Sequence, residues 1–109
     1  MDGLKRKVLA KARKLISIGW TRNAIARNNK NQEVSVLNDD ATCFCLWGAT
    51  LRAAYDLEVM SPYPVTHSIM RELNHFIPDG MGAIQFNDQC VSKKPVLDLI
   101  DRALEGKPA

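Results

Sequence analysis

The residues best suited to nucleophilic chemistry in this 109-residue sequence are three cysteines and two histidines. Cys43 is expected in the first turn of a helix, where the helix dipole and free backbone N–H groups activate a thiol. His67 or His75 could serve as the base, and Asn87 or Asp88 could orient that histidine, as in cysteine hydrolases. These residue types predict a small thiol-dependent hydrolase as one hypothesis for the function.

The same cysteines also have a structural interpretation. Three cysteines cannot all pair within one chain, and a buried free cysteine usually acts as a small apolar side chain. On a helix, Cys43 and Cys45 would point about 200° apart, and His67 and His75 would lie about 12 Å apart along the axis. We therefore expect no metal site and no cofactor, and Cys43 and Cys45 are the alternative nucleophiles of the hydrolase hypothesis.

The pair Asn87-Asp88 is the polar feature of the sequence that most resembles a binding site. Its side chains could hold a ligand's hydroxyl or amine, or a cation. They could instead form an Asx turn that closes the loop over residues 80–92, because both residue types bond readily to nearby backbone. Trp20, Trp47 and Tyr55 could line a pocket beside the pair or fill the core. Asn87, Asp88 and Trp20 are therefore the candidate binding residues.

The basic residues are concentrated at the N-terminus. Residues 1–30 hold nine basic side chains and one acidic one, whereas the remaining residues hold six basic and eleven acidic ones. Lys7, Lys11 and Lys14 share a helical face opposite the apolar one and could follow a nucleic-acid backbone. A solvated face, or a helix docked on the acidic remainder of the chain, explains the same pattern. Nucleic acid is therefore an open hypothesis for the partner, and no recognition motif supports it.

The sequence has no pattern typical of a secretory signal or a membrane-spanning helix. Lys11, Arg13 and Lys14 interrupt the apolar run that a secretory signal needs. A mitochondrial presequence would also be basic and amphipathic, but its removal would take the best apolar face from a small core. The longest uncharged run, 41–51, is about half as long as a membrane-spanning helix. We expect a soluble, cytoplasmic protein with no membrane contact.

The first half of the chain begins with a clear helical pattern and then becomes irregular. Six apolar residues share one face of a helix over residues 4–18: Leu4, Val8, Leu9, Ala12, Leu15 and Ile16. Gly19 should end this helix in the left-handed conformation. Residues 28–31 predict a turn between short extended runs, so residues 20–40 are expected to be irregular or a short hairpin.

The second half of the chain predicts three more helices. Asn38-Asp39-Asp40 should cap a buried helix over 41–57, in which Gly48 permits a close backbone approach. The next helix is expected to start within residues 61–64, with Pro64 in its first turn, and its core face reaches Ile77. Ser92 should cap a last helix that Gly106 and Pro108 end. The chain is thus predicted to be a single domain, 1–109, of mainly α class, a compact bundle of about four helices.

The order of several residues resembles a family of small uncharacterised domains found in bacteria and their phages. The matching pattern is Trp20, then Cys45 with Gly48-Ala49, then Asn87-Asp88. The resemblance implies this fold and a bacterial or phage origin, and it assigns no activity. We therefore expect a small binding or interaction module without enzymatic activity, with a protein or small molecule as its partner. The thiol hydrolase and a nucleic-acid-associated accessory protein are the alternatives.

Overall fold

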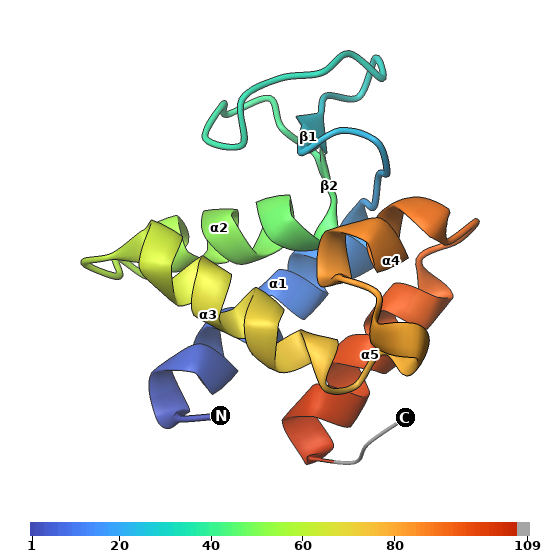
Figure 1. Cartoon of the computed structure of the whole chain (residues 1–109). Coiled ribbons are helices and arrows are strands. Elements are labelled where there is room, and N and C mark those ends of the chain that lie inside the picture. Colours follow the sequence, from blue (N-terminus) through green and yellow to red (C-terminus); the bar gives the residue numbers. More distant parts are fainter. Residues whose placement is uncertain (107–109) are drawn as a thin grey trace.

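The chain folds mainly into α-helices, with a short strand pair between the first and second helix (Figure 1). The structure, a computed structural model, describes residues 1–106. Within them the order of elements is α1 (Gly3–Ile18), β1 (Ala26–Arg27), β2 (Cys43–Phe44), α2 (Leu46–Asp56), α3 (Pro62–Asn74), the 3₁₀ turn η1 (Pro78–Gly80), α4 (Ala83–Gln89) and α5 (Lys94–Glu105). The prediction of a mainly helical, compact fold is confirmed, with five helices in the described part of the chain where about four were expected.

The helices enclose a single apolar cluster. α1 lies behind α2 and α3 in Figure 1 and packs most extensively against α2 and then α5. The residues between α1 and α2, here called the strand segment (residues 19–45), form a cap above the start of α2 and beside α4. The largest fully buried apolar side chains all come from the helices: Leu9, Ile16, Leu46, Ile69, Leu73, Leu99 and Ile100.

The apolar periodicity of α1 is the sequence pattern that the structure follows most closely. Val8, Leu9, Ala12 and Ile16 are fully buried, and Asp2 caps the helix by accepting from the Lys5 N–H at 2.9 Å. The first and last turns depart from the predicted face. Leu4 is 48% exposed and Leu15 is half-buried, because no other helix covers these positions completely.

The hairpin predicted for residues 20–40 is only partly present. The asparagine turn forms, with the Asn28 N–H donating to the Gln32 carbonyl at 2.9 Å and Arg27 opposite Glu33. The regular strand partner of β1, however, is β2, with Ala26 opposite Phe44. β2 follows a loop that includes Val36, so its pairing with β1 does not appear as a local pattern in the sequence.

The predicted start of the second helix was wrong by five residues. α2 begins at Leu46, with Cys45 at its N-cap, so Cys43 lies in a strand and not in a helical turn. Asn38 accepts from the Asp40 N–H at 2.7 Å and so forms an Asx turn instead of capping a helix. Because Cys43 and Phe44 pair with β1, the backbone just before Leu46 is extended and the helix cannot start earlier.

Two glycines allow the strand segment to approach the helices closely. Gly48 was predicted to permit a backbone approach, and a Cβ there would collide with the Ile25 carbonyl oxygen. Gly19 ends α1, but with φ −156° it is extended and not left-handed. A Cβ at Gly19 would collide with the Thr42 carbonyl oxygen. Close approach, not positive φ, explains the second glycine.

The remaining differences lie in the last third of the chain. α3 ends at Asn74, so Phe76 and Ile77 pack from the turn after it. No sequence pattern predicted α4, which places Asn87-Asp88 on a helix and not in an Asx turn. α5 begins at Lys94 without a side-chain cap from Ser92, and Gly106 ends it at φ 73° as predicted. Pro108 lies outside the described residues.

Within residues 1–106, no helix is both long and apolar enough to cross a bilayer.

Candidate functional site

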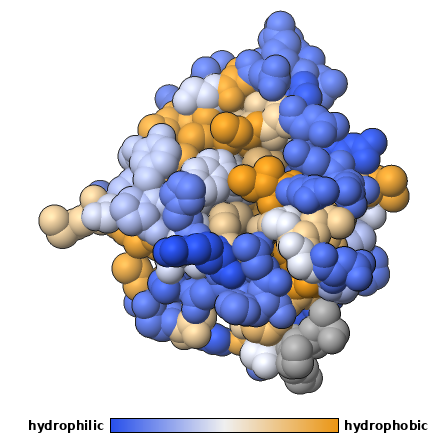
Figure 2. Space-filling view, viewed as in Figure 1, coloured by the Kyte–Doolittle hydropathy of each residue, from blue (hydrophilic) through white to orange (hydrophobic). Residues whose placement is uncertain are grey.

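The most prominent cavity lies where the strand segment meets α2, α3 and α4. It has a volume of about 750 Å³ and opens to solvent. We call it the interhelical pocket, and nine residues line it: Asn23, Ala24, Ile25, Glu33, Cys45, Trp47, His67, Ile84 and Asp88. Figure 2 shows apolar surface gathered in this region between the strand segment and the helices, bordered by hydrophilic side chains. A cavity of this size and mixed lining suits a small organic ligand.

Asp88 presents a fixed carboxylate to the interhelical pocket. Its Oδ1 accepts from the Asn23 N–H at 2.9 Å and from the Asn87 Nδ2 at 3.1 Å. Asn23 has φ 62°, a left-handed conformation that asparagine tolerates better than most residues. Ile84, one turn before Asp88 on α4, lines the same pocket. The carboxylate is therefore oriented from both the helix and the strand segment.

Asn87 is the hydrogen-bonding centre beneath the interhelical pocket. It is fully buried, and its Oδ1 accepts from the Trp20 Nε1 at 2.9 Å and the Leu46 N–H at 3.0 Å. Its Nδ2 donates to the Thr21 carbonyl at 3.2 Å. Asn87 thereby satisfies a free N–H at the start of α2 and ties three elements together. Trp20 joins this network and is not among the pocket's lining residues.

Cys45 is the cysteine that reaches the interhelical pocket. Its side chain is 5% exposed, and its sulfur accepts from the Gly48 N–H at 3.3 Å. Burial raises the pKa of the Cys45 thiol, outweighing the opposing effect of the Gly48 N–H. All three cysteines are free thiols. Cys45 is thus a buried thiol at the N-cap of α2.

The two histidines occupy different parts of the molecule. His67 packs edge-to-face on Trp47, with ring centroids 4.7 Å apart, and lines the interhelical pocket with Cys45 and Asp88. His75, at the end of α3, lines a separate cavity with Glu72 and Arg6. Of the predicted hydrolase residues, the structure thus gathers Cys45, His67 and Asp88 around one cavity.

Five lining residues of the interhelical pocket were not predicted from the sequence: Asn23, Ala24, Ile25, Glu33 and Ile84. Glu33 comes from the loop after the asparagine turn, and Ile25 and Ile84 are about half exposed. The available sequence signal was an isoleucine among small and polar residues. Such a large apolar side chain, when it is left exposed to water, often marks a binding surface. No sequence spacing could place Glu33 opposite α4.

The basic residues of α1 divide into paired and exposed sets. Arg13 forms a bidentate pair with Asp101 at 2.6 and 2.9 Å, and Lys5 lies 3.1 Å from Glu72. Lys7 and Lys14 are exposed and Lys11 is half-buried, and within residues 1–106 the structure shows none of the three in an ion pair. Part of the basic helix therefore neutralises the acidic remainder of the chain, and part faces solvent.

The geometry offers little for metal binding. Among residues 1–106, no group of three or more histidine, cysteine or acidic side chains is arranged to hold an ion. What the fold presents is an open, partly apolar pocket with one oriented carboxylate.

The fold and pocket define a small, mainly helical protein with a candidate ligand-binding cavity. A family model described as a family of unknown function (DUF6197) matches residues 3–105, so the chain belongs to that family. No curated protein and no solved structure matches the chain.

Proposed function

We propose that the protein is a non-enzymatic binding module whose binding site is the interhelical pocket. The observation that carries the proposal is the Asp88 carboxylate, held by the Asn23 N–H and the Asn87 amide at the edge of a cavity with an aromatic wall. An oriented polar group within apolar lining is the usual composition of a small-molecule site. We expect this module to act in the cytoplasm of a bacterium or an infected host cell.

An NMR screen of a small-molecule library against the ¹⁵N-labelled protein tests this proposal. Ligands should shift the Trp47 indole signal and the amides of Ile25 and Asp88. Ile84→Trp should abolish the shifts by filling the cavity, whereas Gln85→Trp, on the neighbouring exposed position of α4, should leave them. Hits that are insensitive to Ile84→Trp, or a screen without pocket shifts, would overturn the proposal.

A thiol hydrolase is a second candidate because Cys45, His67 and Asp88 line one cavity. The burial of Cys45 and its raised pKa weigh against this candidate, since the thiolate is the reactive form. Iodoacetamide labelling of Cys43→Ser/Cys90→Ser, in which Cys45 is the remaining thiol, separates the two functions. A hydrolase predicts rapid labelling of the native protein, whereas the binding module predicts labelling only after unfolding.

A nucleic-acid-associated role is a third candidate, favoured by the exposure of Lys7 and Lys14 on α1. Fluorescence anisotropy with DNA and RNA at low salt tests it, because phosphate binding is strongest there. Lys7→Glu/Lys14→Glu should abolish such binding, whereas Lys30→Glu, in the asparagine turn, should have a smaller effect. Undetectable binding at low salt would remove this candidate.

A further inference from the structure

The interhelical pocket has an acidic character although the whole chain carries a formal charge of +3. Among residues 1–106, its lining includes the carboxylates of Glu33 and Asp88 and no lysine or arginine. A like-charged pair of carboxylates at a partly apolar cavity favours a positive ligand over a negative one. The local charge of the pocket therefore opposes that of the molecule.

The basic residues nearest in sequence to the pocket are directed elsewhere. Arg22 donates to the Cys90 carbonyl at 2.9 Å. Arg27 donates to the Thr21 hydroxyl at 3.0 Å and to the Asn31 carbonyl at 3.1 Å. Because both guanidinium groups have these partners, neither neutralises the pocket carboxylates by a direct ion pair in the structure.

One oxygen of Asp88 is left for a ligand. The hydrogen bonds from Asn23 and Asn87 both end on Oδ1, and within residues 1–106 the structure shows no donor on Oδ2. A carboxylate fixed through one oxygen can accept a charge-assisted hydrogen bond through the other without losing conformational freedom. Asp88 is therefore built to receive an N–H donor.

The remaining walls suit an apolar body joined to that donor. Trp47 supplies an aromatic ring, and Ile25 and Ile84 supply aliphatic surface that is otherwise exposed to water. Aromatic rings also attract cations directly through their electron-rich faces. The acidic and apolar features lie on one cavity, so a single ligand can use both.

We propose that the interhelical pocket binds organic cations of one type: a protonated amine attached to an aromatic or aliphatic body. The ammonium group donates to Asp88, with Glu33 adding a second negative charge, and the body packs on Trp47 and the two isoleucines. This inference rests on the proposed binding function and names its ligand class.

Matched ligand series titrated into the ¹⁵N-labelled protein test the inference. The probes are 2-phenylethylamine, tryptamine and hexylamine, each with the alcohol and the carboxylate of equal chain length. The amines should shift pocket amides with at least about tenfold higher affinity than the alcohols, because a charge-assisted hydrogen bond is stronger than a neutral one. The carboxylates should not saturate the site.

Asp88→Asn tests the contact, since it preserves the shape of the side chain and removes its charge. Amine affinity should fall about tenfold in Asp88→Asn and by a smaller factor in Glu33→Gln. Asp98→Asn on α5 removes the same charge at a residue that does not line the pocket and should leave the affinity unchanged. If Asp88→Asn fails to fold, as judged by its ¹⁵N spectrum, Glu33→Gln carries the test.

The outcomes separate the ligand class from the binding function itself. Alcohols or carboxylates that bind as tightly as the amines, or library hits in the pocket while all three amines fail, overturn the cation inference and leave the binding module intact. Absence of pocket shifts for the probes and for the whole library overturns both.

Discussion

The helical body and the strand segment are held in place by different forces. In the helical body, fully buried leucine and isoleucine side chains come from α1, α2, α3 and α5. In the strand segment the buried apolar side chains are few: Ala26, Val36, Phe44 and Cys45. Its conformation depends instead on polar side chains from α2 and α4, and on close approach at Gly19 and Gly48.

The contrast explains where the interhelical pocket lies. A segment fixed by a few polar contacts can keep Ile25 and Glu33 at the surface, since it need not bury them to stay folded. The helices supply rigid positions for Trp47, His67 and Asp88. One wall of the pocket is therefore formed by the rigid helices and the other by the strand segment, which is held by its own polar contacts. Substitutions in the two walls should have different effects on stability.

Leu9→Ala should give the largest loss, because it opens a cavity in the helical body. Leu9 is fully buried on α1, and leucine-to-alanine changes at such sites cost about 3–5 kcal/mol in unfolding free energy. Urea denaturation measures this loss. Amide exchange should speed up throughout the helices together, and Leu4→Ala, at a half-exposed site, should cost about 1 kcal/mol or less. Equal losses in the two variants would contradict the apolar account of the body.

Gly48→Ala should follow, at about 3 kcal/mol, because the new methyl group would overlap the Ile25 carbonyl oxygen. The strand segment must shift to accommodate it, so amide shifts should concentrate around Ile25 and the interhelical pocket. Gly82→Ala is the matched control, since a Cβ there meets nothing within 4 Å. A variant as stable as the parent would show that the approach is not tight.

Asn87→Ala should cost about 2–3 kcal/mol, because the Leu46 N–H and the Trp20 indole lose their acceptor in a buried site. Trp20 fluorescence should change in the folded state as the indole reorients. The exposed Asn29 provides the control substitution Asn29→Ala. If Asn87→Ala and Asn29→Ala were equally stable, the hydrogen-bonding centre would contribute nothing.

These three sites also show how far sequence reasoning reaches. The burial of Leu9 follows from helical periodicity, a local property of about four turns of chain. The close approach at Gly48 was predicted, but its partner Ile25 was not, because a mid-helix glycine does not indicate which backbone it meets. The Leu46 N–H finds its acceptor in Asn87, 41 residues away, and the local N-cap is Cys45, a residue type that is not among the usual helix caps, so the start of α2 had no recognisable signal.

For the candidate site, too, the sequence indicated the residues but not how they come together. Cys45, His67 and Asp88 were singled out by residue type, and Trp47 was named as a candidate for a pocket wall. Their meeting depends on α4, whose seven residues are too few for a clear periodicity and expose Ile84. Cys43 was assigned to a helix turn, because strand pairing with residues sixteen positions earlier leaves no local trace.

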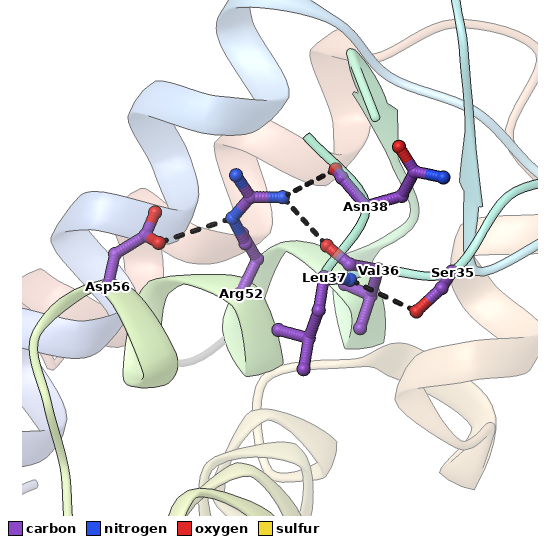
Figure 3. A network of polar contacts seen from close by, with 6 residues as sticks. All are labelled: Ser35, Val36, Leu37, Asn38, Arg52 and Asp56. Atoms are coloured by element: carbon purple, nitrogen blue, oxygen red, sulfur yellow. Dashed lines mark hydrogen bonds and ion pairs between the residues drawn. The ribbon is translucent and has the colours of Figure 1, made fainter. Parts of the chain in front are cut away.

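Arg52→Met tests the polar anchoring of the strand segment at a smaller scale. Arg52 reaches from α2 to the Val36 carbonyl at 2.8 Å and the Asn38 carbonyl at 3.2 Å, and also pairs with Asp56 (Figure 3). Its loss should cost about 1–2 kcal/mol, because methionine fills the space and supplies no donor.

The effect of Arg52→Met should be local. Exchange of the Ala41 amide, which donates to the Asn38 carbonyl at 3.0 Å, should speed up more than that of α5 amides. Arg71→Met, an exposed arginine on α3, is the control. Uniform acceleration throughout the chain would mean that Arg52 supports the helical body and not the strand segment.

The Arg13–Asp101 pair should show the smallest effect and a defined pH dependence. Hydrogen bonds from Arg13 hold the pKa of Asp101 below its ordinary value of 3.8. The folded state therefore binds this proton less readily than the unfolded state. The pair's contribution is present above pH 3.8 and is lost as the pH falls through the folded-state pKa.

Both side chains are more than a third exposed, so solvent screening limits the contribution of this pair to below about 1 kcal/mol. Asp101→Asn should flatten the pH dependence of the unfolding free energy below pH 4, and added salt should reduce the difference from the parent. Asp98→Asn, whose partner Lys94 is 80% exposed, should change the curve less. If Asp101→Asn left the acid limb of the curve unchanged, the Arg13–Asp101 pair would contribute nothing to the docking of α1 on α5. The contrast between an apolar body and a polar strand segment would then be sharper still.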